Sequence, residues 1–408
     1  MIRIFSFLTI TCLLLILFPH VSLAQFELGE EGGTRIYGHV MTDIGYNFGR
    51  INPSWFDVMR PSQLPTAEDQ FGTDGNWYFS VRQTRFGVEH AQPTDVGQLK
   101  LVFEWELFGV GADAGQTTFR LRHAYGELGR WGAGQYWSVF MDIGIFPNSI
   151  EYWGPNGMIL YRNIQLRYKL LETEKAYANI SIEQPGASGD GGQYADSLAL
   201  QDLNPRFPMP DIALEYHRNF NFGYVELAGI VRYITWEDQN QDSIDLSNEV
   251  FGWGLNLTTN VNVGEKNTIR AGFVVGDGIQ NYMNDGGPDI GIENQFSNPS
   301  QPIKGVTQPL WAFSAFLDRT WNERFTSSIG YAMAQIDVAS GQDGTSLEQG
   351  RYGLANVLFH PTRNMLTGVE LQYGGRRNFN DFTYDLLRVQ FSFKYIFSSE
   401  VSLNILKN

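Results

Sequence analysis

The chain has 408 residues, a formal net charge of −15 and one cysteine. Charged residues make up 18% of the chain, below the usual quarter of a soluble protein, while aromatic residues reach 14%. The acidic balance argues against nucleic-acid binding, which needs a basic face. The length is compatible with two or three domains or with one large β-barrel.

The first residues predict a secretory signal peptide. A basic start at Arg3 precedes an apolar run over 4–18, and Ser22 and Ala24 place small residues before the expected cleavage site. The run is shorter than the roughly 20 residues of a membrane-spanning helix. Cys12 lies inside it, so we expect a mature chain without disulfides, thiolate metal sites or cofactors. The expected organisation is a signal peptide (1–24), a periplasmic segment (25–34), a barrel (35–397) and a tail (398–408).

The rest of the chain repeats a strand pattern. In "LKLVFEWELF" (99–108), Leu101, Phe103 and Trp105 fall on one face while Glu104 and Glu106 fall on the other. Alternation with period two indicates strands with one apolar and one polar face. Sixteen segments share this pattern: 35–48, 77–91, 97–108, 117–129, 131–140, 158–170, 174–184, 210–220, 222–237, 249–261, 267–279, 309–320, 323–338, 350–361, 364–375 and 384–397.

The connections between these strands alternate between short and long. Short links are expected at 171–173, 219–222, 264–266, 321–322 and 361–363, and long ones at 49–76, 141–157, 185–209, 280–308 and 339–348. An even strand count with short turns at one end and long loops at the other is typical of outer-membrane barrels. The sequence therefore predicts an all-β fold, a transmembrane antiparallel β-barrel of sixteen strands in the Gram-negative outer membrane.

The cost of charge in lipid decides which face is wet. A lysine or arginine turned toward lipid near the bilayer midplane costs about 2–4 kcal/mol, so the charged face must line the lumen. In "TTFRLRHAYGEL" (117–128) this places Arg120 and Arg122 inside, with Leu121 and His123 outside. Only a subunit interface would explain an outward His123.

The same parity rule predicts the pore-lining set. A lumen lined by both signs of charge creates a transverse field, and guanidinium groups suit carboxylate or phosphate solutes. The alternative is that these residues pair with one another and keep a wet lumen soluble. The expected inward cations are Arg85, Arg120, Arg122, Arg167, Arg270, Arg388, Lys100 and Lys394, and the expected carboxylates are Glu104, Glu106, Glu215, Glu226 and Glu370.

The long connection 141–157 ("MDIGIFPNSIEYWGPNG") is too aromatic for an ordinary exposed loop. We expect it to fold into the lumen as a constriction, presenting Asp142, Glu151, Tyr152 and Trp153. Irregular backbone is tolerated at membrane depth where it lines a water-filled cavity. An extracellular flap or a latch that contacts another subunit of a trimer is the alternative.

Two further patterns carry weaker hypotheses. Asp238, Asn240, Asp242 and Glu249 match positions of a calcium-binding loop, but Ser243 replaces its glycine, so a solvated acidic loop is the preferred interpretation. The histidines are scattered without a hydrolase motif. We therefore expect no enzyme activity, although an outward His123 leaves a barrel hydrolase open as an alternative.

The segment "FRLRHAYGELGRWGAGQYWSVFMDIGIFPNSIEYWGPNG", followed by "RNIQLRYK", resembles the DcaP-like outer-membrane porins. The resemblance implies a homotrimer of sixteen-stranded pores that admits small anions such as dicarboxylates, with Arg122 and Arg167 facing the channel. Two features depart from the family pattern. Only about ten residues (25–34) precede the first strand, where some members carry a coiled coil, and residues 398–408 follow Phe397, whereas many barrels end on the final aromatic residue. The matched elements are Leu121 to Gly126, Gly134-Gln135, Trp137 to Phe140, Gly154-Pro155 and Arg167-Tyr168.

These patterns together predict an outer-membrane porin for passive diffusion of small hydrophilic solutes, with a preference for small anions at an arginine-lined constriction. Its expected partners are outer-membrane lipid, other copies of itself and small, mostly anionic solutes. A structural or adhesive barrel with a plugged lumen and a barrel that hydrolyses lipids or esters remain the alternatives.

Overall fold

The structure, a computed structural model, describes residues 32–240 and 244–401. Strands dominate it, and its helices are short: α1 (Leu198–Gln201) and the single 3₁₀ turns Pro53–Trp55, Pro61–Gln63, Gly111–Asp113, Ile143–Ile145, Gly192–Tyr194 and Gln280–Tyr282. None of the helices in the described part of the chain is long and apolar enough to cross a membrane.

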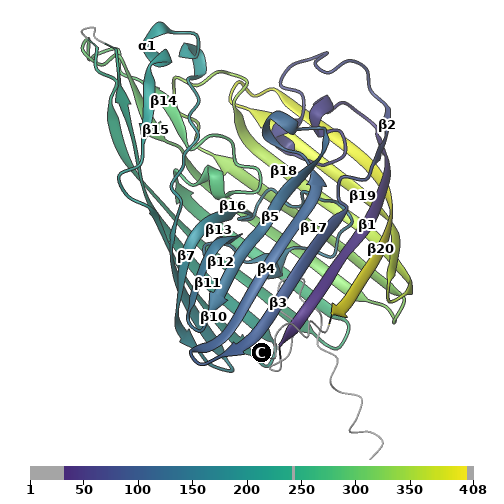
Figure 1. Ribbon diagram of the computed structural model, residues 1–408. Coiled ribbons are helices and arrows are strands. Elements are labelled where there is room, and N and C mark those ends of the chain that lie inside the picture. Colours follow the sequence, from purple (N-terminus) through teal and green to yellow (C-terminus); the bar gives the residue numbers. More distant parts are fainter. Residues whose placement is uncertain (1–31, 241–243, 402–408) are drawn as a thin grey trace, which may run out of the picture.

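Eighteen strands form one antiparallel sheet that curls into a ring (Figure 1). A separate hairpin, β14 (Ile290–Asn294) and β15 (Ile303–Thr307), lies in a loop. The strands of the ring are β1 (Gly33–Asn47), β2 (Asn76–Ser80), β3 (Arg85–Thr94), β4 (Gly97–Phe108), β5 (Thr117–Leu128), β6 (Trp131–Trp137), β7 (Arg162–Glu172), β8 (Ala176–Glu183), β9 (Leu203–Arg206), β10 (Asp211–Phe220), β11 (Gly223–Asp238), β12 (Asn248–Val263), β13 (Asn267–Asp277), β16 (Pro309–Thr320), β17 (Phe325–Ile336), β18 (Leu347–Thr362), β19 (Met365–Asn378) and β20 (Thr383–Val401).

The ring closes where β1 pairs with β20. β2 and β3 pair with successive parts of β1, and β9 and β10 pair with successive parts of β11, so each pair shares one position in the wall. The eighteen strands therefore occupy sixteen wall positions, and the predicted sixteen-stranded closed barrel is confirmed. Closure satisfies the edge groups that an open sheet would leave unpaired in lipid.

The connections differ at the two ends of the barrel. Short turns join β3 to β4, β5 to β6, β12 to β13 and β18 to β19, whereas the other end carries long loops and the β14–β15 hairpin (Figure 1). In outer-membrane barrels the short turns face the periplasm and the long loops face the exterior. The predicted asymmetry of the connections is therefore present.

The alternation of side chains along the wall follows the prediction. On β4, Leu101 and Phe103 are exposed on the outer surface, while Val102 and Glu104 are buried on the inner one. An apolar exterior and a charged interior are what a lipid-facing barrel requires.

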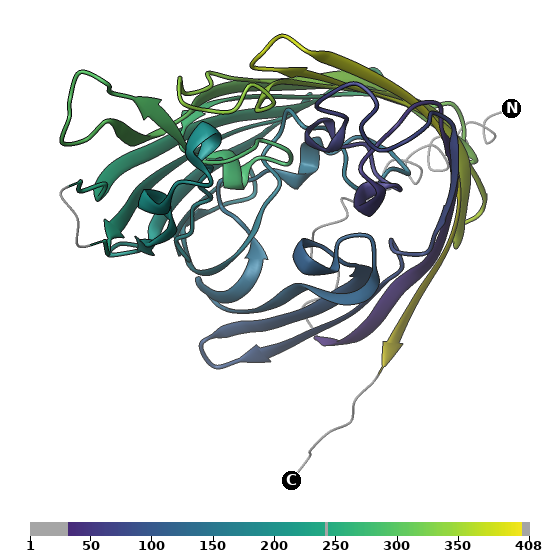
Figure 2. The same cartoon turned by 90° about the horizontal axis from the view of Figure 1, so that it is seen from above.

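The interior also holds an apolar core that the alternation alone did not predict. Phe140, Ile279 and Tyr282 belong to connections between strands, and they pack against small inward-facing residues of the wall such as Ala228 and Ala312. Seen from above, several loop segments lie inside the ring of strands (Figure 2). Small wall residues therefore leave room for large side chains that the loops bring in.

A β-bulge corrects the expected orientation of His123. Glu104 pairs with His123 and Trp105 pairs with Leu121, so Arg122 is an extra residue on β5 without an opposing partner. A bulge shifts the alternation by one residue, and Arg122 and His123 are both buried within the barrel. The prediction of an outward His123 was wrong, and no subunit interface is needed to explain this residue.

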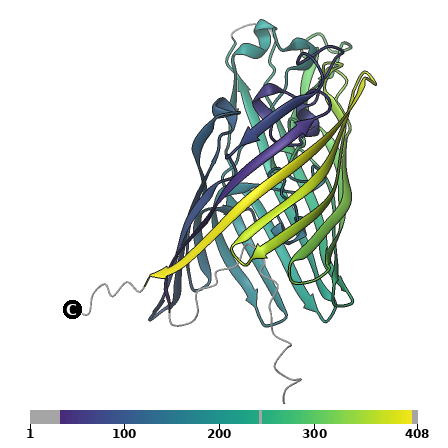
Figure 3. The same cartoon turned by 90° about the vertical axis from the view of Figure 1, so that its right-hand side faces the viewer.

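The last strand is longer than expected. β20 continues four residues past Phe397 and pairs with β1 from Arg388 to Val401. It runs obliquely across the whole wall beside β1 (Figure 3). The residues that follow Phe397 thus begin as part of the barrel seam.

The orientation of the wall generates a first prediction. Phe103→Arg is expected to lower the free energy of unfolding by about 2–4 kcal/mol, because it places a guanidinium toward lipid near the middle of β4. Phe296→Arg, in the exposed loop between β14 and β15, is the control and is expected to change stability by less than about 0.5 kcal/mol. Denaturant unfolding in lipid vesicles measures both. Equal destabilisation by the two substitutions would contradict the assigned orientation.

Candidate functional site

The connection between β6 and β7 folds into the lumen as predicted. Its backbone is held by amide side chains that project inward from the wall: Asn256 donates to Phe140 O at 3.0 Å, and Asn356 donates to Asn148 O at 2.7 Å. Gln390, on the far seam of the barrel, donates to Ile150 O at 3.0 Å. These contacts satisfy backbone groups that have no strand partner, which makes irregular backbone tolerable at membrane depth.

Glu370 secures the middle of this connection, residues 141–157, which we call the constriction loop. Its carboxylate accepts from Ser149 Oγ at 3.0 Å, from Ile150 N at 3.1 Å and from Asn356 Nδ2 at 2.8 Å. The side chain is fully buried. Glu370 therefore faces inward, as the alternation predicted, but it binds the loop and has no surface open to the lumen.

The two predicted acidic residues of the loop are engaged in similar contacts. Asp142 accepts from Thr258 Oγ1 at 2.6 Å and from Tyr224 OH at 2.8 Å. Glu151 accepts from Met59 N at 2.9 Å and from Gly154 N. Both carboxylates are buried, so they position the loop more than they present charge to a solute.

Trp153 locks the loop to two other extracellular loops. The Arg60 guanidinium packs against both the Trp55 ring, 4.3 Å from its centroid, and the Trp153 ring, 4.1 Å from its centroid. Arg60 also forms an ion pair with Asp285 at 2.8 Å. Trp153 donates from Nε1 to Asn284 O at 2.8 Å. This node combines cation–π contacts with a partly buried ion pair, and its members outside the loop were not predicted.

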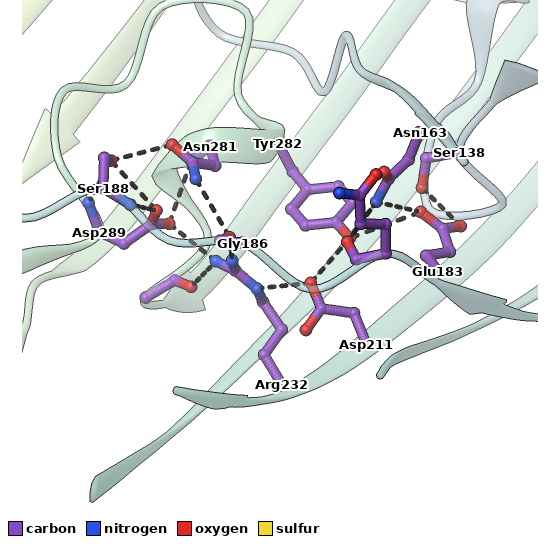
Figure 4. A network of polar contacts seen from close by, with 12 residues as sticks. Ser138, Asn163, Glu183, Gly186, Ser188, Asp211, Arg232, Asn281, Tyr282 and Asp289 are labelled. Carbon is purple, nitrogen blue, oxygen red and sulfur yellow. Dashed lines mark hydrogen bonds and ion pairs between the residues drawn. The ribbon is translucent and has the colours of Figure 1, made fainter. Parts of the chain in front are cut away.

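A second polar network ties further loops to the wall near β8, β10 and β11 (Figure 4). Arg232 is buried and donates to Asp211 at 3.0 Å and to Asp289 at 2.8 Å, and it also binds the carbonyls of Gly186 and Gly278. Tyr282 donates to the same Asp211 at 2.9 Å. Arg232 was absent from the predicted set, and its role is to hold loops rather than to line the pore.

The predicted arginines of β3 and β5 gather around two buried carboxylates. Arg122 donates to Glu104 at 2.6 Å and to Glu106 at 2.7 Å. Arg85 lies 3.4 Å from Glu106 and 3.8 Å from Glu104, and Arg120 lies 3.8 Å from Glu106. Tyr152 of the constriction loop also donates to Glu106, and its ring stacks on Phe108. Wall and loop therefore meet at this point.

Two more cations belong to this group. Arg162 lies 3.9 Å from Glu106. Lys394 of β20 pairs with Met41 of β1, and Arg85 of β3 pairs with His39, two residues along β1. The charge of Lys394 interacts with those of Arg85 and Arg122. We call Arg85, Arg120, Arg122, Arg162 and Lys394, with Glu104 and Glu106, the basic cluster.

Arg162 escaped the sequence prediction for a physical reason. Along β7, Ile164 and Leu166 face outward, so alternation alone would place Arg162 outward as well. It is the first residue of the strand, where the chain emerges from the lumen, and its guanidinium turns over the Trp137 ring at 5.1 Å. Its place directly after an inward-folded loop was the signal that could have identified it.

The remaining predicted cations lie elsewhere. Arg167 donates to Trp137 O at 2.6 Å and to Gln165 at 3.1 Å, and Arg270 pairs with Asp318 at 2.6 Å and binds Gly144 O. Arg388 is fully buried and donates to Asn47 at 2.6 Å and to Phe56 O at 3.0 Å. Lys100 is half-buried on β4, opposite Glu127 of β5. None of these four joins the basic cluster.

The acidic residues of β10 and β11 occupy another sector of the wall. Glu215 accepts from Asn179 Nδ2 at 2.5 Å. Glu226 accepts from Tyr177 OH at 3.1 Å and lies 2.9 Å from His217 Nδ1. Together with Asp142, which is bound to Tyr224 of β11, they form an acidic sector separate from the basic cluster.

The possible calcium loop receives no geometric support. Asp238 accepts from Asn240 N at 2.9 Å and from Leu246 N at 3.0 Å, and Glu249 accepts from Tyr233 OH. Asp242 lies outside the described residues. Within residues 32–240 and 244–401, no group of three or more His, Cys, Asp or Glu side chains is placed to hold a metal ion.

Comparison with known families agrees with this architecture. The family model "DcaP outer membrane protein" matches residues 29–397. The chain belongs to the DcaP family. It is a porin-type channel protein of the Gram-negative outer membrane. A search of curated proteins found no match.

Solved structures show the same fold as this DcaP-family chain. The outer membrane channel DcaP of Acinetobacter baumannii has a TM-score of 0.75 and 18% identity, covering 92% of this chain and all (100%) of that one. A trimer form of OmpT of Vibrio cholerae has a TM-score of 0.54 and 12% identity, covering 90% and 100%. The anion-selective porin from Comamonas acidovorans has a TM-score of 0.52 and 10% identity, covering 90% and 100%.

The anchoring of the constriction loop generates a second prediction. Glu370→Ala is expected to destabilise the DcaP-family barrel by at least about 2 kcal/mol, since it leaves several buried donors unpaired. It should also increase the open-channel current noise in single-channel recordings, because the released loop moves within the lumen.

Glu348→Ala is the matched control. Glu348 pairs with Arg377 at 3.0 Å, is partly exposed and makes no contact with the loop. Its removal is expected to cost less than about 1 kcal/mol and to leave the current noise unchanged. If the open-channel current noise of Glu370→Ala equals that of the wild type, this carboxylate does not hold the loop.

Proposed function

We propose that this channel passes small hydrophilic solutes by passive diffusion and prefers small anions such as dicarboxylates, with the basic cluster as the anion-contacting part of the constriction. The observation that supports the preference is the imbalance of charge in the cluster. Five cations surround two carboxylates, and only Arg122 makes close hydrogen bonds to both of them.

The contacts of Glu106 explain why donors remain for a solute. One of its oxygens accepts from Tyr152 and the other from Arg122. Arg85, Arg120 and Arg162 approach the same carboxylate only to 3.4–3.9 Å. A carboxylate has few acceptor sites, so N–H groups of these arginines stay available for the oxygens of an anionic solute.

Exposure separates the roles within the cluster. The side chains of Arg85 and Arg120 are 25% and 27% exposed, whereas that of Arg122 is 7% exposed. Arg85 and Arg120 are therefore proposed to contact the solute, and Arg122 to position Glu104 and Glu106. Lys394 has no hydrogen bond or ion pair to any described residue, and it adds a further cation for the anion.

The separation of the basic cluster from the acidic sector of the lumen supports a diffusion mechanism. An excess of positive charge at a narrow, low-dielectric point raises the local concentration of anions and speeds their entry. Arginines that make only long ion pairs with a protein carboxylate can bind a carboxylate of the solute instead without a large desolvation cost. Binding that is favourable but weak lets the solute leave toward the periplasm.

The homotrimer is also part of the proposal. β5 pairs with β6 only over Ala124–Leu128, so the edge at 117–123 has β4 alone as its strand partner. Phe119 on this stretch is exposed. An uncovered strand edge is unfavourable in lipid, and a second copy of the chain would cover it. The signal peptide over 1–24 is proposed on its sequence pattern alone.

The alternatives are weaker on specific grounds. The hydrolase hypothesis needed His123 on the outer wall, whereas this side chain lies inside, against the rings of Tyr136 and Trp137 at 4.6 and 4.9 Å. A structural barrel with a plugged lumen would show no conductance in a planar bilayer. The same recording therefore tests the pore and its selectivity.

The proposal predicts the ion selectivity of the wild-type channel. Reversal potentials in a KCl gradient are expected to show a preference for chloride, and the triple variant Arg85→Gln, Arg120→Gln, Lys394→Gln should lose at least half of that preference, because it removes the partly exposed, loosely paired cations of the cluster. Selectivity for potassium in the wild type would reject the anion preference while leaving the pore intact.

Removal of three cations outside the lumen provides the control. Lys175, Arg206 and Arg324 are exposed in turns or near strand ends, and their replacement by Gln is expected to leave the reversal potential unchanged. An equal shift in both triple variants would mean that the net charge of the protein, rather than the basic cluster, sets the selectivity.

A further inference from the structure

The outer wall has a hollow between β17 and β18. Its volume is about 480 Å³, within the range of small-ligand sites. Its lining mixes apolar and small polar side chains of the two strands with two residues of the adjoining turn: Trp321, Asn322, Phe325, Ser327, Ser328, Ile329, Ala355, Asn356 and Val357.

The hollow lies where the two strands lose regular pairing. Thr326 pairs with Leu358 and Ile329 pairs with Ala355, but the positions between them are not paired. There Ser328 N donates to the side chain of Asn356 at 2.7 Å instead of to the opposing backbone. Asn356 also donates to Asn148 O of the constriction loop. The side chain that anchors the loop thus stands between the strands.

The shape of the hollow suits a hydrocarbon chain. Ser327 and Ala355 form a floor of small residues, flanked by the exposed side chains of Phe325, Ile329 and Val357. From Phe325 to Ile329 the strand advances about 13 Å at roughly 3.3 Å per residue. Barrel strands tilt by about 35–45°, so this stretch covers about 10 Å of depth, roughly two thirds of the hydrocarbon depth of about 15 Å of the periplasmic leaflet.

The rim of the hollow carries a cation. Arg319 stands over the Trp321 ring, 4.2 Å from its centroid, and Trp321 donates from Nε1 to Ser327 Oγ at 2.9 Å. Arg319 donates from Nη1 to Asn267 at 3.0 Å, and its Nε is buried, so its remaining terminal N–H groups are the donors open to a ligand. The short turn between β16 and β17 marks this end as periplasmic. Tryptophan and arginine at this depth are typical of the headgroup interface.

We propose that this hollow is a binding site for a phospholipid of the periplasmic leaflet. One acyl chain lies along Ser327 and Ala355, and the phosphate accepts hydrogen bonds from Arg319. A guanidinium is well suited to phosphate oxygens. The site lies on the outer surface and involves no residue of the basic cluster, so it does not depend on the anion preference of the pore.

Native mass spectrometry of the purified protein in detergent, titrated with phosphatidylglycerol, tests the site. The wild type is expected to retain one more lipid than Ala355→Leu, which fills the hollow. Arg319→Gln is expected to weaken retention of that lipid about tenfold, because it removes a charge-assisted hydrogen bond.

Two controls match these substitutions. Ala315→Leu adds the same bulk at an exposed position of β16 outside the hollow, and Lys175→Gln removes a cation from a distant exposed turn. Both should retain lipid as the wild type does, and all four variants should keep wild-type conductance. Equal lipid retention in every variant would overturn the proposal. Loss of oligomer without loss of lipid in Ala355→Leu would overturn it too, and would identify the hollow as a subunit contact.

Discussion

The satisfaction of backbone polar groups at membrane depth is the constraint on which this structure depends. In the wall, closure of β1 onto β20 gives most strands a paired neighbour on each side, with the 117–123 edge of β5 as an exception. In the lumen, the same requirement falls on the constriction loop, whose carbonyls and amides bind inward-facing side chains such as Asn256, Asn356 and Glu370. The polar interior of the barrel is therefore used largely for holding loops.

This use of the interior divides the inward arginines into two groups. Arg82, Arg232 and Arg388 are buried and bind loop carbonyls or carboxylates, so they hold segments that have no strand partner. Arg85 and Arg120 keep exposed surface and make only loose ion pairs. A guanidinium can perform both tasks because it offers five donors in a fixed plane. What a given arginine does depends on whether a loop reaches it.

The same distinction sets the limit of what the sequence could predict. Lipid enforces strict alternation, so the sixteen strands and their sidedness were predictable from residues such as Phe103 and Glu104, whereas the aromatic residues of 141–157 indicated the inward-folded loop. Alternation gave the wrong side for His123, because the bulge at Arg122 depends on how β4 and β5 pair and leaves no local pattern. It gave the correct inward direction for Arg388 and Glu370 but not their loop partners, which lie hundreds of residues away in the chain. Which loop meets which wall position is set by tertiary packing.

The bulge at Arg122 also explains how so many cations coexist. An extra residue lets Arg122 reach both Glu104 and Glu106, while His123 remains inside against aromatic rings. The two carboxylates then lie close to Arg85, Arg120 and Arg162 and offset part of their mutual repulsion. Cations without carboxylates would repel one another out of position, so two carboxylates among five cations keep the guanidinium groups in place.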